Sequence, residues 1–159
     1  MTKLPYAPLS LAPAKVCVEA LAGGGMVLRS GHALRPYARC VGDSLVGWAA
    51  RAPDRTFLAE RDAAGDWRRM SYAEALGAVR AIAQALLDRR LGPGRPVAIL
   101  SDNSIHSALL QLAAMHVGIP AAPVSPAYAL MSRDFGKLKA IAALLAPSMV
   151  FAADGAEFA

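Results

Sequence analysis

Three short apolar runs, separated from one another by segments with helical periodicity, constrain the fold of this chain most. The runs are Val97–Leu100, Ala121–Val124 and Met149–Ala152, and the helical segments between them span residues 104–117 and 134–146. Four apolar residues are too few for a helix but suit a strand that is buried on both faces. Helical crossovers between such strands predict an α/β fold with a parallel sheet covered on both faces.

A capping signal predicts a further helix ahead of the first of these strands. Ser71 and Glu74 have the S-x-x-E spacing in which each side chain bonds the other residue's backbone N–H. Apolar residues then recur at helical spacing as far as Leu87, and Gly92 is predicted to end the helix.

Two β-hairpins are predicted in the first half of the chain. Residues 16–19 and 26–29 flank Gly23-Gly24-Gly25, which suits the positive backbone dihedrals of a turn. Thr56–Arg61 and residues 67–70 form the second candidate pair. The triple glycine lacks the GK[ST] ending of a phosphate-binding P-loop, so we interpret it as a turn.

A helix is expected between the two hairpins. Asp43 and Ser44 can cap it, and it should stop before Pro53, because a residue that precedes proline disfavours helical dihedrals. Cys17 and Cys40 lie too far apart for a CxxC pair and are predicted to be free thiols.

The charge distribution argues against nucleic-acid binding. The formal net charge is +5, and 13 of the 17 basic residues lie in the first 90 positions. They are scattered arginines, with Arg68-Arg69 and Arg89-Arg90 as the only adjacent pairs, whereas nucleic-acid sites cluster basic residues on one face. No nucleic-acid partner is expected.

The apolar content raises the question of a membrane span. Hydrophobic residues make up 55% of the chain, and the best candidate span, residues 140–153, is interrupted by Pro147 and Ser148. A span needs about 18 apolar residues, so we predict a buried helix end followed by a buried strand. Pro5, Pro8 and Pro13 would break the helix of an export signal, so a cytoplasmic location is predicted.

Catalytic motifs are missing from the sequence. His32, His106 and His116 have no metal-ligand spacing, and no G-x-S-x-G nucleophile elbow occurs. Residues 101–104 follow a predicted strand, where open α/β sheets place ligands, but Asn103 or Ser104 is favoured as a simple helix cap. We therefore predict no catalytic, cofactor-binding or metal-binding residue.

Four segments, in order and spacing, resemble the N-terminal subdomain of AMP-forming acyl-CoA ligases. They are residues 48–56, 70–76, 97–104 and 118–128. Within that superfamily the chain is most similar to the feruloyl-CoA synthetases, through Leu28-Arg29-Ser30, Pro36-Tyr37, Leu58-Ala59-Glu60-Arg61, Pro123 to Tyr128 and Asp134 to Leu138.

The resemblance implies a reaction in two half-steps. Ferulate or a related hydroxycinnamate attacks the α-phosphate of Mg-ATP, and the thiol of CoA then displaces AMP from the acyl-adenylate. ATP, Mg²⁺ and CoA are thus implied for a full-length ligase, whose phosphate-binding loop and catalytic lysine have no counterpart in this chain. Ser125, Pro126 and Tyr128 are the substrate-binding candidates, by position alone.

The domain prediction follows from this resemblance. Residues 1–15 form an extended Pro-rich lead, and residues 16–159 form a partial AMP-binding domain that stops before the phosphate-binding loop. The chain is then the N-terminal fragment of a longer ligase, has the remainder of that ligase as its partner, binds no cofactor strongly and is inactive alone.

Two other functions stay open at this level. The chain could be a self-contained, non-catalytic α/β module that binds another copy or a ligase through its apolar surface. It could also be a plain nucleotide-binding domain, which the missing phosphate loop disfavours.

Overall fold

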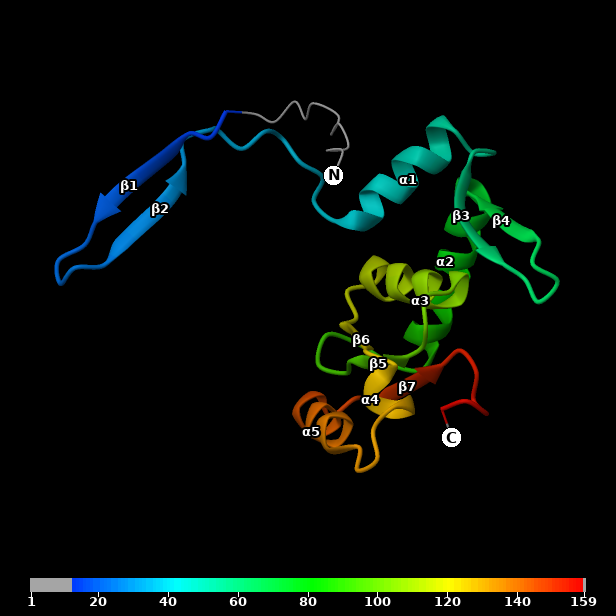
Figure 1. The fold of residues 1–159 in the computed structure, drawn as a ribbon. Helices are drawn as coiled ribbons and strands as arrows, with labels where there is room; N and C mark the ends of the chain where they lie inside the picture. Colours follow the sequence, from blue (N-terminus) through cyan, green and yellow to red (C-terminus); the bar gives the residue numbers. More distant parts are fainter. Residues whose placement is uncertain (1–12, 159) are drawn as a thin grey trace, which may run out of the picture. The chain divides into compact units, whose positions relative to one another are not determined.

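A computed structural model describes residues 13–158 in two compact units, one up to residue 37 and one from residue 38 onward. Most of the predicted Pro-rich lead, residues 1–15, lies outside the described residues. Figure 1 shows the elements in chain order: β1 Val16–Ala20, β2 Met26–Ser30, α1 Val41–Arg51, β3 Thr56–Arg61, β4 Trp67–Ser71, α2 Tyr72–Asp88, β5 Val97–Leu100, α3 Ile105–His116, β6 Ala121–Val124, α4 Ala127–Leu130, α5 Gly136–Leu145 and β7 Met149–Ala152.

The first unit is the predicted β1–β2 hairpin. Its strands pair antiparallel, with Val18 opposite Leu28. Gly23 and Gly24 take φ values of +101° and +83°, which residues with a side chain rarely adopt. The triple glycine is therefore a turn, as predicted.

The second unit contains a three-stranded parallel sheet in the order β6-β5-β7. Ile99 of the central strand β5 pairs with Pro123 of β6 and with Phe151 of β7. The second predicted hairpin, β3–β4, comes before this sheet in the sequence, and its two strands pair antiparallel. The predicted α/β class and the parallel pairing are confirmed.

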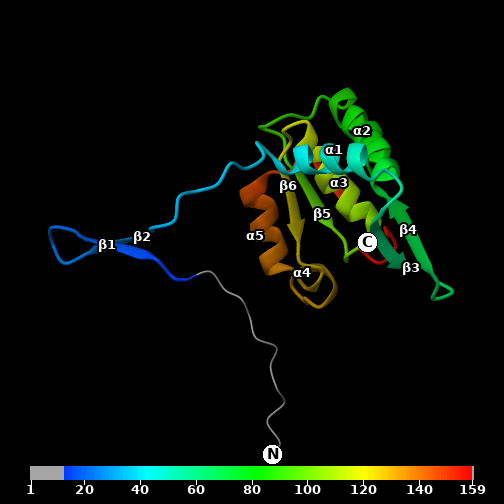
Figure 2. The ribbon, with the colours of Figure 1, turned by 90° about the horizontal axis from the view of Figure 1, so that it is seen from above.

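Helices lie on both sides of the parallel sheet. Figure 2 shows α5 on one side of β5 and β6, and α2 and α3 on the other. Val97 and Ile99 are fully buried in the core shared with α2 and α3, whereas Ala98 and Leu100 line a cavity with residues of α5. This alternation along β5 is the period of a strand with two covered faces.

Residues 140–153 are less buried than predicted. No residue of α5 is buried, and Leu144 is 85% exposed. Strand β7 is only half-buried, because it forms an edge of the sheet. In the described residues, no helix is long and apolar enough to cross a membrane.

Helix ends differ from the prediction at several places. α1 begins at Val41, so Asp43 lies in its first turn and does not cap it. α2 ends at Asp88 rather than at Gly92, because Arg90 takes the left-handed φ of +57° that usually belongs to a glycine. The single-turn helix α4 was not predicted.

Both cysteines of the chain are free thiols, as predicted, with Cys17 exposed and Cys40 partly buried.

The predicted capping box at the start of α2 is confirmed. The Ser71 hydroxyl accepts the Glu74 N–H at 3.3 Å, and the Glu74 carboxylate accepts the Ser71 N–H at 2.7 Å. The second bond and the Ser71 hydroxyl lower the pKa of Glu74 below its ordinary value. The capping contribution of Glu74 is therefore complete at neutral pH and lost as the pH falls through the lowered pKa.

Replacing Ser71 by alanine is expected to reduce the free energy of unfolding by about 1 kcal/mol, because one N–H of the first helical turn loses its acceptor. Urea denaturation followed by tryptophan fluorescence measures this change. Ser44→Ala, at an exposed position of α1, is the matched control and should change stability by less than about 0.5 kcal/mol. Equal losses in both variants would contradict the capping role.

Candidate functional site

The carboxyl ends of the three parallel strands form one edge of the sheet. Leu100 at the end of β5 pairs with Val124 of β6 and with Ala152 of β7, so the segments that follow all begin at this edge. Ligands of open α/β sheets bind outside this edge. It is therefore the candidate functional site.

The three substrate-binding candidates lie in the turn that follows β6. Ser125 is exposed, and its carbonyl accepts the Tyr128 N–H at 3.0 Å. Pro126 and Tyr128 are half-buried, and Pro126 precedes the first residue of α4. The Lys137 ammonium lies 5.3 Å from the centre of the Tyr128 ring, a cation–π contact that the sequence did not indicate.

The segment that follows β5 serves mainly to begin α3. The Ser104 hydroxyl accepts the Ser107 N–H at 3.1 Å, so Ser104 is the helix cap that the sequence favoured. The Ser101 hydroxyl donates to the carbonyl of its neighbour Asp102 at 2.8 Å. These bonds are local and hold the loop rather than a ligand.

Glu60 of β3 reaches this loop from the second hairpin. One of its carboxylate oxygens accepts the Ile105 N–H at 2.6 Å, and the other forms an ion pair with Arg68 of β4. The Glu60 side chain is only 25% exposed. A carboxylate at a helix N-terminus is favoured by the helix dipole, so Glu60 anchors the hairpin to the start of α3.

A carboxylate also accepts a backbone N–H group at the start of α5. The Asp134 carboxylate accepts the Gly136 N–H at 3.0 Å and the Ser132 hydroxyl at 3.2 Å. These two bonds, the backbone one first, hold the pKa of Asp134 below its ordinary value.

These side chains occupy some of the N–H groups at the edge of the sheet. A phosphate at the carboxyl edge of an α/β sheet is usually held by free N–H groups of a helix N-terminus. Here side chains of the chain itself already accept N–H groups at the first turns of α3 and α5. The N–H groups of Ile105, Ser107 and Gly136 therefore already have an acceptor within the chain.

Two apolar cavities flank the sheet. One of about 190 Å³ lies between the sheet and α5 and is lined by Leu100, Val124, Leu138 and Ile141, among others. The other, of about 340 Å³, lies beside β7 and is lined mainly by apolar residues of α2, α3 and β7, with His106 and Arg89. Val124, the last residue of β6, lines the first cavity, and the substrate-binding candidates begin at the next residue, Ser125.

The histidines do not assemble a metal site. His106 and His116 lie at opposite ends of α3, and the His32 ring nitrogen Nε2 lies 2.8 Å from the Pro13 carbonyl oxygen in the first unit. Among residues 13–158, no group of three or more histidine, cysteine or acidic side chains could hold a metal ion.

The fold has the architecture of the N-terminal part of adenylate-forming ligases, and sequence comparison gives the family. The sequence profile of AMP-binding enzymes matches residues 45–156. The chain belongs to the AMP-binding enzyme family.

Solved structures of adenylate-forming proteins share this fold. The fatty acid AMP ligase from Legionella pneumophila superimposes with a TM-score of 0.64 at 19% identity, over 72% of this chain and 20% of the ligase. The N-terminal subdomain of NpsA from Klebsiella oxytoca, in complex with 3-hydroxyanthranilyl-AMSN, superimposes with a TM-score of 0.62 at 22% identity. That match covers 76% of this chain and 28% of the subdomain.

This chain therefore spans between a fifth and about three tenths of the solved structures to which it is similar. No curated protein matches the sequence.

Proposed function

We propose that this chain is the N-terminal part of an ATP-dependent ligase that activates a carboxylic acid as its acyl-adenylate. The observation that carries the proposal is the family match over residues 45–156. The share of the ligases that the chain spans supports a larger active protein, in which the remaining chain is the partner of these residues.

The substrate proposed for the full-length ligase is ferulate or a related hydroxycinnamate, with a CoA thioester as the product. Support comes from the sequence resemblance to feruloyl-CoA synthetases, which includes residues 123–128 at the candidate site. In this proposal ATP, Mg²⁺ and CoA bind mainly to parts of the ligase beyond these residues, because the sequence contains no phosphate-binding loop and the N–H groups of Ile105 and Gly136 already have acceptors.

The proposed role of residues 38–158 is structural support for the acid-binding site. The sheet fixes the turn after β6, and Tyr128 presents an aromatic ring held against the Lys137 ammonium. An aromatic ring at this position can stack on a hydroxycinnamate ring at a cost of little side-chain entropy. Ser125 offers an exposed hydroxyl beside it.

An activity assay tests the proposal. The full-length product of the gene, incubated with ferulate, ATP, Mg²⁺ and CoA, is expected to release AMP and form feruloyl-CoA. The 159-residue chain alone is expected to show no activity above background. A long-chain fatty acid and an assay without CoA are the matched controls.

Two results would contradict parts of this proposal. Acyl-adenylate formation by the 159-residue chain would overturn the assignment of ATP binding to other parts of the ligase. A full-length protein that activates fatty acids and ignores hydroxycinnamates would overturn the substrate while leaving the ligase class intact.

A further inference from the structure

The parallel sheet has two outer strands, β6 and β7. In the described part of the chain, each of them pairs with β5 on one side only. Along a strand, the backbone N–H and C=O groups of successive residues point alternately to the two sides. Each outer strand therefore directs the backbone groups of every second residue away from β5.

The outer edge of β6 is interrupted by a proline. The Val97 N–H of β5 donates to the Pro120 carbonyl at 2.9 Å, so the backbone groups of Ala122 also face β5. The backbone nitrogens of Ala121 and Pro123 then point outward. Proline has no N–H group, so this edge lacks a donor at Pro123. Proline on an edge strand is a usual device that stops a sheet from extending.

The outer edge of β7 has no such device. The Ser148 N–H donates to the Pro96 carbonyl at 3.0 Å, so the backbone groups of Val150 also face β5. The N–H and C=O groups of Met149 and Phe151 then point outward, and no strand of the described chain pairs with that side of β7. The strand contains neither proline nor a charged residue, the two common means of blocking an edge. This edge can therefore accept a further strand.

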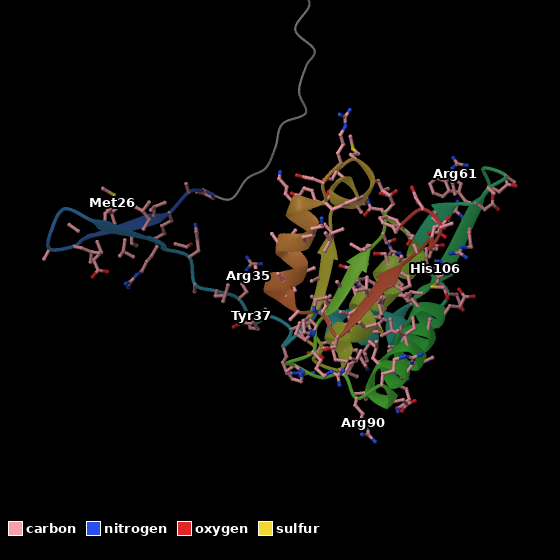
Figure 3. The ribbon with its side chains drawn as sticks, turned by 90° about the horizontal axis from the view of Figure 1, so that it is seen from below. Met26, Arg35, Tyr37, Arg61, Arg90 and His106 are labelled. Carbon is pink, nitrogen blue, oxygen red and sulfur yellow. The ribbon has the colours of Figure 1, made fainter. Side chains whose placement is uncertain are left out.

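The larger apolar cavity, of about 340 Å³, adjoins the same strand. Met149 and Phe151 line it from the sheet, and residues such as Leu86 of α2 and Leu110 of α3 line it from the helices. Figure 3 shows His106, another lining residue, beside the red ribbon of β7. A strand that pairs with β7 directs every second side chain toward the layer of α2 and α3. Apolar side chains at those positions fill this cavity.

A strand from the same ligase chain fits this edge better than a second copy does. Strands that follow one another in a sequence are neighbours in the sheet about two-thirds of the time. A tethered strand meets the edge at an effective concentration on the order of 1 mM, whereas a second copy competes only at its free concentration. The chain leaves β7 at the carboxyl edge of the sheet, so a parallel strand needs a crossover of about a dozen residues or more.

We propose that the sheet continues at the outer edge of β7 in the full-length ligase. A parallel strand from the chain beyond these residues pairs with the outward backbone groups of Met149 and Phe151 and covers the cavity beside β7. The strand β6 stays the true edge of the sheet. This inference rests on the proposed function, in which the residues belong to a longer ligase, but it does not depend on which acid the ligase activates.

Hydrogen exchange in the full-length product of the gene tests the proposal, with single amides resolved by fragmentation mass spectrometry. The amides of Met149 and Phe151 are expected to exchange at least about tenfold more slowly than the amide of Ala121. Ala121 is the matched control, because it points outward from β6 and pairs with Val97, as Met149 does from β7. In the 159-residue chain alone, all three amides should exchange rapidly. The comparison within the full-length protein decides the matter even if the shorter chain does not fold.

Two results would overturn the proposal. Equal exchange at the two outer edges of the full-length protein would show that no strand extends the sheet at β7. Slow exchange at Met149 and Phe151 in the 159-residue chain alone, if it grows with protein concentration, would show that a second copy occupies the edge. The activity assay is read separately. Slow exchange at β7 in a protein that activates no carboxylic acid contradicts only the proposed function, whereas acid activation with rapid exchange at β7 contradicts only this inference.

Discussion

Replacing Ile99 by alanine is expected to lower the free energy of unfolding of the second unit by about 3–4 kcal/mol. Ile99 has no exposed surface, lies on the central strand of the sheet and packs in the core that α2 and α3 share. Truncation removes apolar contacts on a strand that has neighbours on both sides, so the cavity cannot close by a small shift. Urea denaturation followed by tryptophan fluorescence measures the loss.

Two further variants make this prediction specific. Val150→Ala removes apolar atoms from the neighbouring strand at a position that is 57% exposed, and it should cost less than about 1 kcal/mol. Ile99→Val removes one methylene and should cost about 1 kcal/mol, which keeps the test valid if Ile99→Ala does not fold. Equal losses for Ile99→Ala and Val150→Ala would show that β5 is not the centre of the core.

The sequence was sufficient to predict the elements of the fold because their signals are local. The short apolar runs 97–100 and 121–124 became neighbouring parallel strands, and the Ser71 capping box formed as predicted. Each of these predictions rests on a period or a spacing within one short stretch of the chain.

Predictions failed where several neighbouring residues could end a helix, and where the burial of an element depends on which other elements cover it. The sequence predicts that α2 ends at Gly92, but the chain turns at Arg90, so the three residues 89–91 separate Asp88, the last residue of the helix, from the glycine. The exposure of α5 was not foreseen, because an apolar sequence does not reveal how much of it other elements cover.

The candidate site could be predicted only in outline. The place of Ser125, Pro126 and Tyr128 at the carboxyl edge follows from the order of helices and strands. The contact between Lys137 and Tyr128 depends on how the loop before α5 folds back, and no spacing in the sequence encodes it.

The contact that Glu60 makes is a clearer example of one that the sequence does not predict. It lies 45 residues before Ile105, and its carboxylate meets the start of α3 because the fold brings β3 against that helix. Glu60 lies in a segment of the sequence that resembles feruloyl-CoA synthetases, but the sequence predicts no role for it. The structure assigns it a positioning role at the edge where the candidate site lies.

Removal of the Glu60 carboxylate should therefore destabilise the second unit. Glu60→Ala is expected to lower the free energy of unfolding of the second unit by about 2–3 kcal/mol, because a charge-assisted bond to a partly buried backbone N–H is lost and Arg68 loses its partner. Hydrogen exchange should also become faster in residues 101–107, since the loop and the first turn of α3 lose their anchor.

A matched variant separates this anchor from an ordinary surface ion pair. Glu19→Ala breaks the exposed pair with Arg29 in the first unit and should change stability by less than about 0.5 kcal/mol. Glu60→Gln keeps an acceptor for the Ile105 N–H and should recover part of the loss. If Glu60→Ala changed neither stability nor exchange in residues 101–107, Glu60 would be a surface residue, and the start of α3 would depend on the Ser104 cap alone.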